Sequence, residues 1–230
     1  MGVELNTNKI QNILNIVNTI SNKKIVTNEN ERKFIDGTIA ELKNNMVFRI
    51  GDYAFLSRTF LTSVSFPACT NIGSGAFQDC TKLATVSFPE CTNIGSNAFA
   101  SCYFLTAVSF PACTSIGGYA FYSCTSLATV SFPACTTISN GAFYSCAFTS
   151  ISFPVCERIG NSAFCYCTKL SSIYLGASTV CTLSNSNAFY STSIGSTTGS
   201  IYVPSSLVAS YKATTNWKYF SNRIYSYAFS

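Results

Sequence analysis

The chain has 230 residues, of which 47% are hydrophobic, 14% aromatic and 10% charged, and its formal net charge is +5. So much apolar surface excludes a disordered chain, and the sequence lacks the run of about 18 apolar residues that a membrane-spanning helix needs. We therefore expect no membrane insertion. It contains no histidine, which excludes histidine-dependent catalytic triads and metal sites. Because residues 51–200 carry no dense basic stripe, we also expect no nucleic-acid binding.

Residues 1–45 are expected to form an N-terminal helical cap followed by a degenerate first repeat. Ile39 and Leu42 precede the corresponding residues of the next unit by 22 positions. The segment lacks the continuous apolar core of a secretory signal. Capping is the simpler interpretation, and self-association or docking through the helix is the alternative. Five apolar residues have the spacing of one helix face: Ile10, Ile13, Leu14, Val17 and Ile20.

A repeat of 22 residues is regular over residues 46–176, and one unit, beginning at Leu61, reads LTSVSFPACTNIGSGAFQDCTK. A unit of this length cannot bury its own apolar face, but stacked copies share one core. The repeat therefore predicts a solenoid. Ala-Phe pairs in register with it are separated by 22, 22, 22, 22, 21 and 25 residues: Ala54-Phe55, Ala76-Phe77, Ala98-Phe99, Ala120-Phe121, Ala142-Phe143, Ala163-Phe164 and Ala188-Phe189.

Each unit predicts a strand, a turn and a short helical segment. Val64 and Phe66 alternate with serine, which is typical of a strand with one buried face. Pro67 cannot donate a ladder hydrogen bond and should end the strand. Gly73, after Ile72, is expected to permit a turn through its conformational freedom. The Ala-Phe pair should then form one or two helical turns with the phenylalanine pointing inward.

These residues resemble a known family. The pattern L-x-x-V-x-F-x-x-C, from Leu61 to Cys69, is similar to the leucine-rich-repeat signature. The continuation I-G-x-x-A-F-x-x-C, from Ile72 to Cys80, resembles the BspA-like (type 5) repeats, and the resemblance covers residues 39–203. It implies an α/β solenoid: a right-handed arc with a parallel β-sheet on its concave face and short helical caps at both ends.

Known members of that family are bacterial surface adhesins and proteins associated with the tails of gut-bacterial phages. The stretch GSIYVPSSLVASYKATTNWKYFSNRI is similar to the ending of the phage-linked members. The resemblance thus implies an extracellular protein on a cell surface or a phage particle, although neither a signal peptide nor an anchor is visible in the sequence.

Residues 177–230 are expected to form an irregular last repeat and a C-terminal cap. The interval of 25 residues between Phe164 and Phe189 marks the irregular unit. Pro204 then precedes a predicted helix that carries Tyr211 and Trp217. This segment should cover the open end of the stack, since solenoids need terminal units with a polar outer face.

The cysteines form two ladders along the repeat, and the first eight are eleven residues apart. No C-x(2–4)-C pair suggests zinc. Disulfides between neighbouring coils are conceivable, but buried free thiols are favoured because free cysteine behaves as a small hydrophobic residue. The twelve are Cys69, Cys80, Cys91, Cys102, Cys113, Cys124, Cys135, Cys146, Cys156, Cys165, Cys167 and Cys181.

No catalytic, cofactor or metal site is predicted. The carboxylates of the repeats, Asp52, Asp79, Glu90 and Glu157, occupy different repeat positions and should not converge. No base is available to activate a serine, and no G-x-S-x-G elbow or phosphate loop occurs. We therefore expect a non-enzymatic protein that needs no cofactor.

Two surfaces are candidate binding sites. The outward strand positions should form a grid of hydroxyls on the concave face, which either keeps the sheet soluble or binds an extended polar ligand. These are Ser63, Ser65, Thr85, Ser87, Ser109, Thr129, Ser131, Ser150, Ser152, Ser172 and Tyr174. A candidate aromatic patch beside the Ala-Phe segments comprises Tyr103, Tyr119, Tyr122 and Tyr144; it is either a binding surface or a structural ladder.

The predicted function is a recognition or adhesion module for protein or glycan at a bacterial or host cell surface. The alternative is a structural or assembly protein that docks other subunits through its caps.

Overall fold

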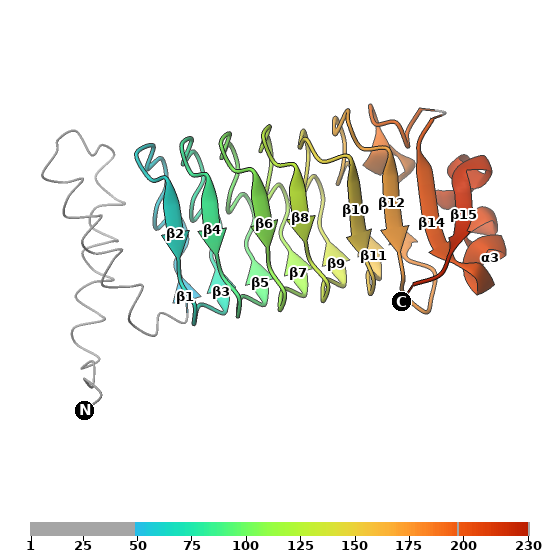
Figure 1. The fold of residues 1–230 in the computed structure, drawn as a ribbon, viewed down its shortest axis with the longest axis horizontal. Helices are drawn as coiled ribbons and strands as arrows, with labels where there is room; N and C mark the ends of the chain where they lie inside the picture. The colour runs from blue at the N-terminus through green and yellow to red at the C-terminus, as the bar shows by residue number, and fades with distance from the viewer. Residues whose placement is uncertain (1–48, 197, 230) are drawn as a thin grey trace, which may run out of the picture.

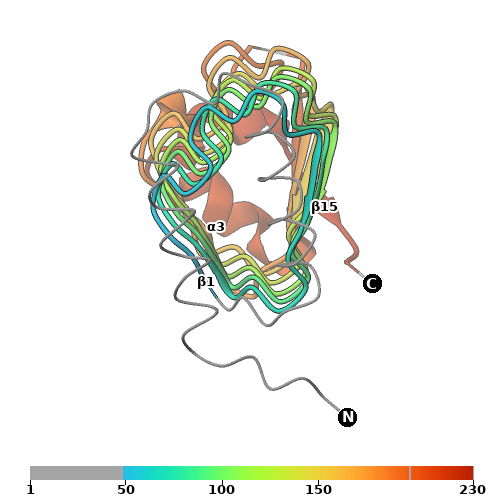
Figure 2. The same cartoon turned by 90° about the vertical axis from the view of Figure 1, so that its left-hand side faces the viewer.

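Successive repeats form successive coils of a solenoid, and all its paired strands are parallel (Figure 1). The structure is a computed structural model that describes residues 49–196 and 198–229. The predicted N-terminal helical cap and degenerate first repeat lie outside the described residues. Viewed from its end, the stack shows the coils following one another around a common axis (Figure 2). The solenoid predicted from the repeat, and the α/β class that the family resemblance implies, are thus confirmed.

One row of strands comes from the predicted L-x-x-V-x-F pattern. Each strand of the regular repeats ends at or just before the phenylalanine that precedes proline, as predicted. Backbone hydrogen bonds join the row in three groups, β2-β4, β6-β8 and β10-β12-β14-β15. The strands are β2 (Ser63–Ser65), β4 (Thr85–Ser87), β6 (Ala107–Ser109), β8 (Thr129–Ser131), β10 (Ser150–Phe153), β12 (Ser172–Leu175), β14 (Ser200–Pro204) and β15 (Ile224–Tyr227).

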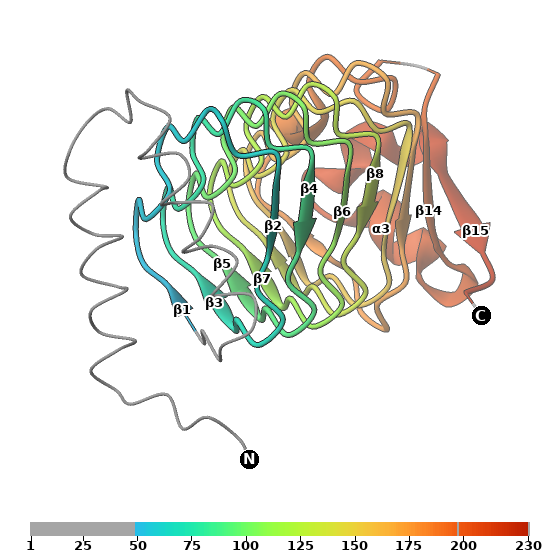
Figure 3. The same ribbon diagram turned by 60° about the vertical axis from the view of Figure 1, so that its left-hand side comes forward.

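A second row forms a continuous seven-stranded sheet on another side of the coils (Figure 3). Its members are β1 (Arg49–Ile50), β3 (Asn71–Ile72), β5 (Asn93–Ile94), β7 (Ser115–Ile116), β9 (Thr137–Ile138), β11 (Arg158–Ile159) and β13 (Thr182–Leu183). This second row was not predicted from the sequence: Ile72, which precedes the glycine of the predicted turn, pairs in register with Ile94.

The glycine after this strand allows close approach of the coils, although two units carry serine at the same position, Ser139 and Ser184. A Cβ on Gly95 would lie 2.6 Å from the carbonyl carbon of Gly73, and one on Gly117 would lie 2.5 Å from that of Gly95. Neither Gly95 nor Gly117 has a left-handed φ. The expectation that these glycines supply conformational freedom is therefore wrong; they leave room for the backbone of the preceding coil.

The Ala-Phe segments of the regular repeats form turns, which corrects the predicted helical turns. The N–H of Phe77 donates to the carbonyl of Ala98 in the next coil at 2.7 Å, and Phe99 donates likewise to Ala120. These amides thus bond between coils and cannot build a helical ladder within one. Only the irregular last repeat has a helical turn here among the described residues, η1 (Ser186–Phe189).

Two columns of stacked phenylalanines fill the core, and their rings point inward as predicted. In the first column the ring centroids of successive residues are 5.0 to 5.7 Å apart; it contains Phe55, Phe77, Phe99, Phe121, Phe143, Phe164 and Phe189. In the second the separations are 5.5 to 6.5 Å; it contains Phe66, Phe88, Phe110, Phe132 and Phe153. Tilted and edge-on contacts join the two columns.

The C-terminal end of the stack is covered by short helices: η2 (Ser205–Leu207), α3 (Val208–Ala213) and η3 (Trp217–Arg223) (Figures 1 and 2). The indole Nε1 of Trp217 donates to the carbonyl of Cys181 at 2.6 Å. The N–H of Cys181 donates to the hydroxyl of Tyr211 at 2.9 Å. Trp217 and Tyr211 are fully buried, so the cap both covers the last phenylalanine and satisfies backbone groups of the last coil.

Candidate functional site

The predicted grid of hydroxyls lies on one face, formed by the outward positions of β2, β4, β6, β8 and β10. We call this row of residues the serine face. The inward residues Val64, Val108 and Ile151 alternate with it and are 3% exposed. On β2–β10 all the predicted hydroxyl residues are exposed except Ser65, which is half-buried; Ala107 interrupts the grid.

Register holds the hydroxyls in line from coil to coil. Ser65 pairs with Ser87, and Ser109 pairs with Ser131. Hydrogen-bonded strands are about 4.8 Å apart, so the hydroxyls repeat at that spacing within each pair; β4 and β6, and β8 and β10, lie in neighbouring coils without a paired ladder. None of the outward residues on these five strands is charged. The face can therefore donate and accept hydrogen bonds but cannot form ion pairs of its own.

At the C-terminal end the row changes from serine to tyrosine. Ser152 on β10 pairs with Tyr174 on β12, Tyr174 pairs with Tyr202 on β14, and Tyr202 pairs with Tyr225 on β15. The rings of Tyr174 and Tyr202 are stacked, with centroids 4.7 Å apart and an interplanar angle of 13°. Tyr227 meets Tyr174 at 5.0 Å in an edge-on arrangement. The serine face thus ends at a cluster of tyrosines, Tyr174, Tyr202, Tyr225 and Tyr227, which we call the aromatic step.

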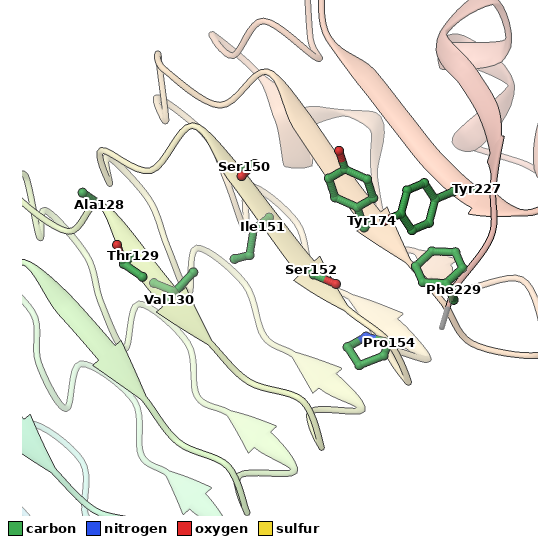
Figure 4. A pocket seen from close by; sticks show the side chains of 10 residues that line it. All are labelled: Ala128, Thr129, Val130, Ser150, Ile151, Ser152, Pro154, Tyr174, Tyr227 and Phe229. Atoms are coloured by element: carbon green, nitrogen blue, oxygen red, sulfur yellow. The ribbon is translucent and has the colours of Figure 1, made fainter.

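A hollow of about 640 Å³ lies at this step (Figure 4). Serine and threonine from β8 and β10 line it on one side, and Tyr174, Tyr227 and Phe229 line it on the other (Figure 4). The full lining is Ala128, Thr129, Val130, Ser150, Ile151, Ser152, Pro154, Tyr174, Tyr227 and Phe229. None of these residues carries a charge at neutral pH.

The predicted aromatic patch forms part of a tyrosine ladder along the Ala-Phe edge. Tyr119 meets Tyr122 at 5.9 Å, and Tyr122 meets Tyr144 at 5.3 Å. The structure extends the ladder through Tyr166 and Tyr190, at 5.2 and 5.6 Å. Burial and, to a smaller degree, neighbouring groups raise the pKa of Tyr144. The rings are therefore packed on one another while their outer edges stay in solvent.

Tyr103 does not join this ladder: it is 43% exposed, and among the described residues no ring contact connects it with the other tyrosines. Tyr166 was missed because it follows Cys165 and occupies a different position of its unit from Tyr144. Tyr202, Tyr225 and Tyr227 were also missed. For Tyr202 the sequence signal was the alternation in Ser200-Ile-Tyr-Val, since it continues the strand pattern of the regular repeats.

All twelve cysteines are buried free thiols, as favoured from the sequence. In one ladder each thiol donates to a backbone carbonyl two residues ahead, as Cys113 does to Ser115 at 3.3 Å. In the other it donates to the preceding coil, as Cys124 does to Phe99 at 3.2 Å. Burial raises the pKa of the Cys113 and Cys124 thiols to about 12. Such thiols stay protonated at neutral pH and lack the thiolate that acts as a nucleophile.

The carboxylates of the repeats do not form a cluster in the described residues. The carboxylate of Asp52 accepts a hydrogen bond from the N–H of Ser74 at 2.7 Å, which supports the turn of the next coil. Within residues 49–196 and 198–229 no group of three or more cysteine or acidic residues could hold a metal ion. In the same part of the chain no helix has the length and apolar character needed to cross a membrane.

Comparison with known families matches the coils to one repeat type. The model of the BspA type leucine-rich repeat region matches in six copies, over residues 8–106, 48–154 and 92–211. The chain belongs to the BspA-type leucine-rich repeat family. In this family member the repeat positions that face inward include the phenylalanine columns and the cysteine ladders described above.

Two solved structures are similar to this leucine-rich repeat chain. A leucine-rich cell surface protein from Faecalibacterium prausnitzii is 33% identical with a TM-score of 0.47, over 57% of this chain and 44% of that chain. A leucine-rich repeat protein from Bacteroides ovatus is 22% identical with a TM-score of 0.31, over 68% of this chain and 59% of that chain. The chain thus covers less than two thirds of either protein. No curated protein matches it.

Proposed function

We propose that this leucine-rich repeat protein is a non-enzymatic recognition module that binds protein or glycan at a cell surface through the serine face. The observation that carries the proposal is the in-register row of exposed hydroxyls, which is uncharged and ends at exposed tyrosines. Tyrosine and serine together favour recognition: tyrosine supplies large contact area at low entropic cost, and serine supplies adaptable hydrogen bonding.

The row also has the right extent for a ligand that contacts many units weakly. Each hydroxyl contributes little by itself, because a net hydrogen bond is worth about 0.5–1.5 kcal/mol. Repetition at one spacing lets a repetitive ligand make the same contact on successive coils. This arrangement favours an extended surface polymer over a single small molecule.

We further propose display outside the cell, on a bacterial surface or a phage particle. Membership in the BspA-type family and the resemblance of the C-terminal stretch to phage-linked members support this location. An assembly role, in which the ends of the solenoid dock other subunits, is the competing function that the binding experiment separates.

The test is binding of the labelled full chain to a panel of bacterial and epithelial cells. In the test variant Ser87→Glu and Ser131→Glu place charges two strands apart, about 10 Å, so that their mutual repulsion is largely screened in 0.1 M salt. The control variant carries Ser126→Glu and Thr168→Glu, which add the same charge at exposed positions away from the serine face.

Saturable binding that falls at least tenfold in the test variant, with the control variant unchanged and both variants folded, is the expected result. Equal loss in both variants would place binding elsewhere. Absence of binding to every cell type, combined with self-association in light scattering, would support the assembly function instead.

A further inference from the structure

The hollow at the aromatic step carries chemistry that the rest of the serine face lacks. The ring of Tyr174 is stacked on Tyr202 on one side. On the other side its partner in register is Ser152, whose side chain is too short to cover a ring. Tyr227 meets Tyr174 edge-on and is 45% exposed. An aromatic wall thus stands beside a floor of hydroxyls (Figure 4).

The lining selects among ligand classes. A charged group would find no opposite charge there, because all ten lining residues are uncharged. A purely apolar ligand would remove water from the hydroxyls of Ser150, Ser152 and Thr129 without replacing their hydrogen bonds, which costs free energy. The hollow therefore favours a ligand that is neutral, has one apolar face, and carries polar groups around its rim.

A polypeptide strand is a poorer fit. Extended peptides bind sheets by adding to an exposed edge through backbone hydrogen bonds. The hollow lies on the face of the strand row, where β10, β12, β14 and β15 pair with one another. β8 is not paired with β10, but the adjoining coils are held together by the hydrogen bond from the N–H of Ala147 to the carbonyl of Leu127, 3.1 Å long. Recognition here must come from side chains alone.

We infer that the hollow is a binding subsite for a neutral hexose unit of a surface glycan, an inference that rests on the proposed recognition function. A pyranose has the required chemistry: its axial C–H groups form an apolar face and its hydroxyls form a polar rim. The C–H groups stack on the electron-rich face of Tyr174, since aromatic faces carry negative charge density. The rim hydroxyls reach Ser152 and Ser150 directly or through water. A volume of about 640 Å³ lies within the range of about 300–1,000 Å³ that small-ligand sites occupy.

The serine face then supplies the remaining contacts of the same glycan. Its uncharged hydroxyl row runs from Ser152 toward Ser65 without a side chain that blocks the path, since the outward positions between them are serine, threonine or alanine. The terminal sugar sets the orientation at the aromatic step, and the following sugars lie along the coils.

The experiment uses the full chain and an array of neutral oligosaccharides built from glucose, galactose, mannose and their N-acetyl forms. Ligand-observed saturation-transfer NMR on the best binder reports which sugar protons approach the protein. The expected result is saturable binding with transfer strongest to C–H protons on one ring face. Tyr174→Ala and Tyr227→Ala should each weaken binding at least tenfold, and Tyr174→Phe should retain it within threefold because the ring is kept.

Tyr219→Ala is the matched control, since Tyr219 is 62% exposed and lies outside the hollow. Circular dichroism and thermal unfolding check that each variant folds. Absence of neutral-glycan binding, or binding that Tyr174→Ala and Tyr227→Ala leave unchanged, would overturn the inference, as would capture of a peptide in place of a sugar. If cell binding is still lost in the Ser87 and Ser131 double variant, the proposed function stands while the hexose subsite falls.

Discussion

Substitution of Gly95 by alanine tests whether the spacing of the coils, rather than the conformation of the glycine, is what requires this residue. The added Cβ would lie 2.6 Å from both the carbonyl carbon of Gly73 and the amide nitrogen of Ser74, and 2.8 Å from the carbonyl oxygen of Gly73. All three atoms belong to the backbone of the preceding coil. No side-chain rotation can therefore relieve the overlap, and the backbone must shift by the small amount that Ser139 requires at the same repeat position, where its N–H still lies 3.0 Å from the carbonyl oxygen of Ile116.

The expected cost follows from this geometry. Inserting a methyl group into a packed site costs about 1–3 kcal/mol, and because serine occupies the same repeat position at Ser139 and Ser184, Gly95→Ala should lie near the lower value. The backbone shift should also lengthen the hydrogen bond from the N–H of Gly95 to the carbonyl of Ile72, which is 2.8 Å long, toward the 3.0 Å of the bond from Ser139 to Ile116. A loss of about 1 kcal/mol lowers the thermal midpoint by about 2–4 °C for a chain of this size.

Gly118→Ala is the matched control in the next coil. Its new Cβ would lie 3.4 Å from the nearest atom, the carbonyl oxygen of Asn140, and its φ is not left-handed. Because alanine reduces the entropy of the unfolded chain, this variant should be unchanged or more stable by up to about 1 kcal/mol. Thermal unfolding followed by circular dichroism compares the two. A Gly95→Ala midpoint equal to that of Gly118→Ala would refute the close-approach explanation.

Three further measurements test the packing. Phe121→Ala removes a buried ring stacked at 5.3 Å on both neighbours and should lower the free energy of unfolding in urea by about 3–5 kcal/mol. Phe104→Ala changes a residue that is 62% exposed and should alter that free energy by less than about 0.5 kcal/mol. Equal effects would contradict the stacking of Phe121 in the buried phenylalanine column. Tyr211→Phe leaves the buried N–H of Cys181 without its hydroxyl acceptor and should cost about 1–3 kcal/mol in the same assay, so an unchanged midpoint would argue against that hydrogen bond. Burial raises the pKa of the Cys124 thiol to about 12, against about 8.5 in an unfolded chain. As the pH rises, the unfolded state therefore loses this proton before the folded state does. The free energy of unfolding should be highest below about pH 8.5 and should decline as the pH rises toward 12. Unfolding midpoints measured between about pH 8 and pH 11 should fall steadily, and a flat profile would show that the thiols are not shielded.

The alternating pattern of the strands could be predicted from the sequence because it is a local signal. Val64 and Phe66 point inward and Ser65 outward for the same reason in every unit, and identical units stack in a single register. The second row of strands carried no such signal. A strand of two residues such as Asn71–Ile72 is too short to show a period of two, and only pairing with the next coil makes it part of a sheet.

The Ala-Phe segment shows how tertiary contacts override local preference. Alanine and the short interval between turns were compatible with a helix, but the N–H of Phe77 bonds to the next coil. The twelve thiols were placed correctly because free cysteine behaves as a small hydrophobic residue and the family resemblance implies its burial inside the coil. Which carbonyl each thiol bonds to depended on the distance between coils.

The repeat in the sequence by itself determined that the chain stacks, which residues form the core, and that a row of hydroxyls faces outward. Those properties follow from periodicity, since each residue position meets the same neighbours in every coil. Only the tertiary structure decided that the row ends at an aromatic step. Ser152, Tyr174 and Tyr202 belong to three successive strands, and Tyr227 comes from a fourth strand beyond the C-terminal cap. The tyrosine rings meet because the irregular last units continue the register of the sheet. The local alternation in Ser200-Ile-Tyr-Val indicates a strand but not the strands with which it pairs.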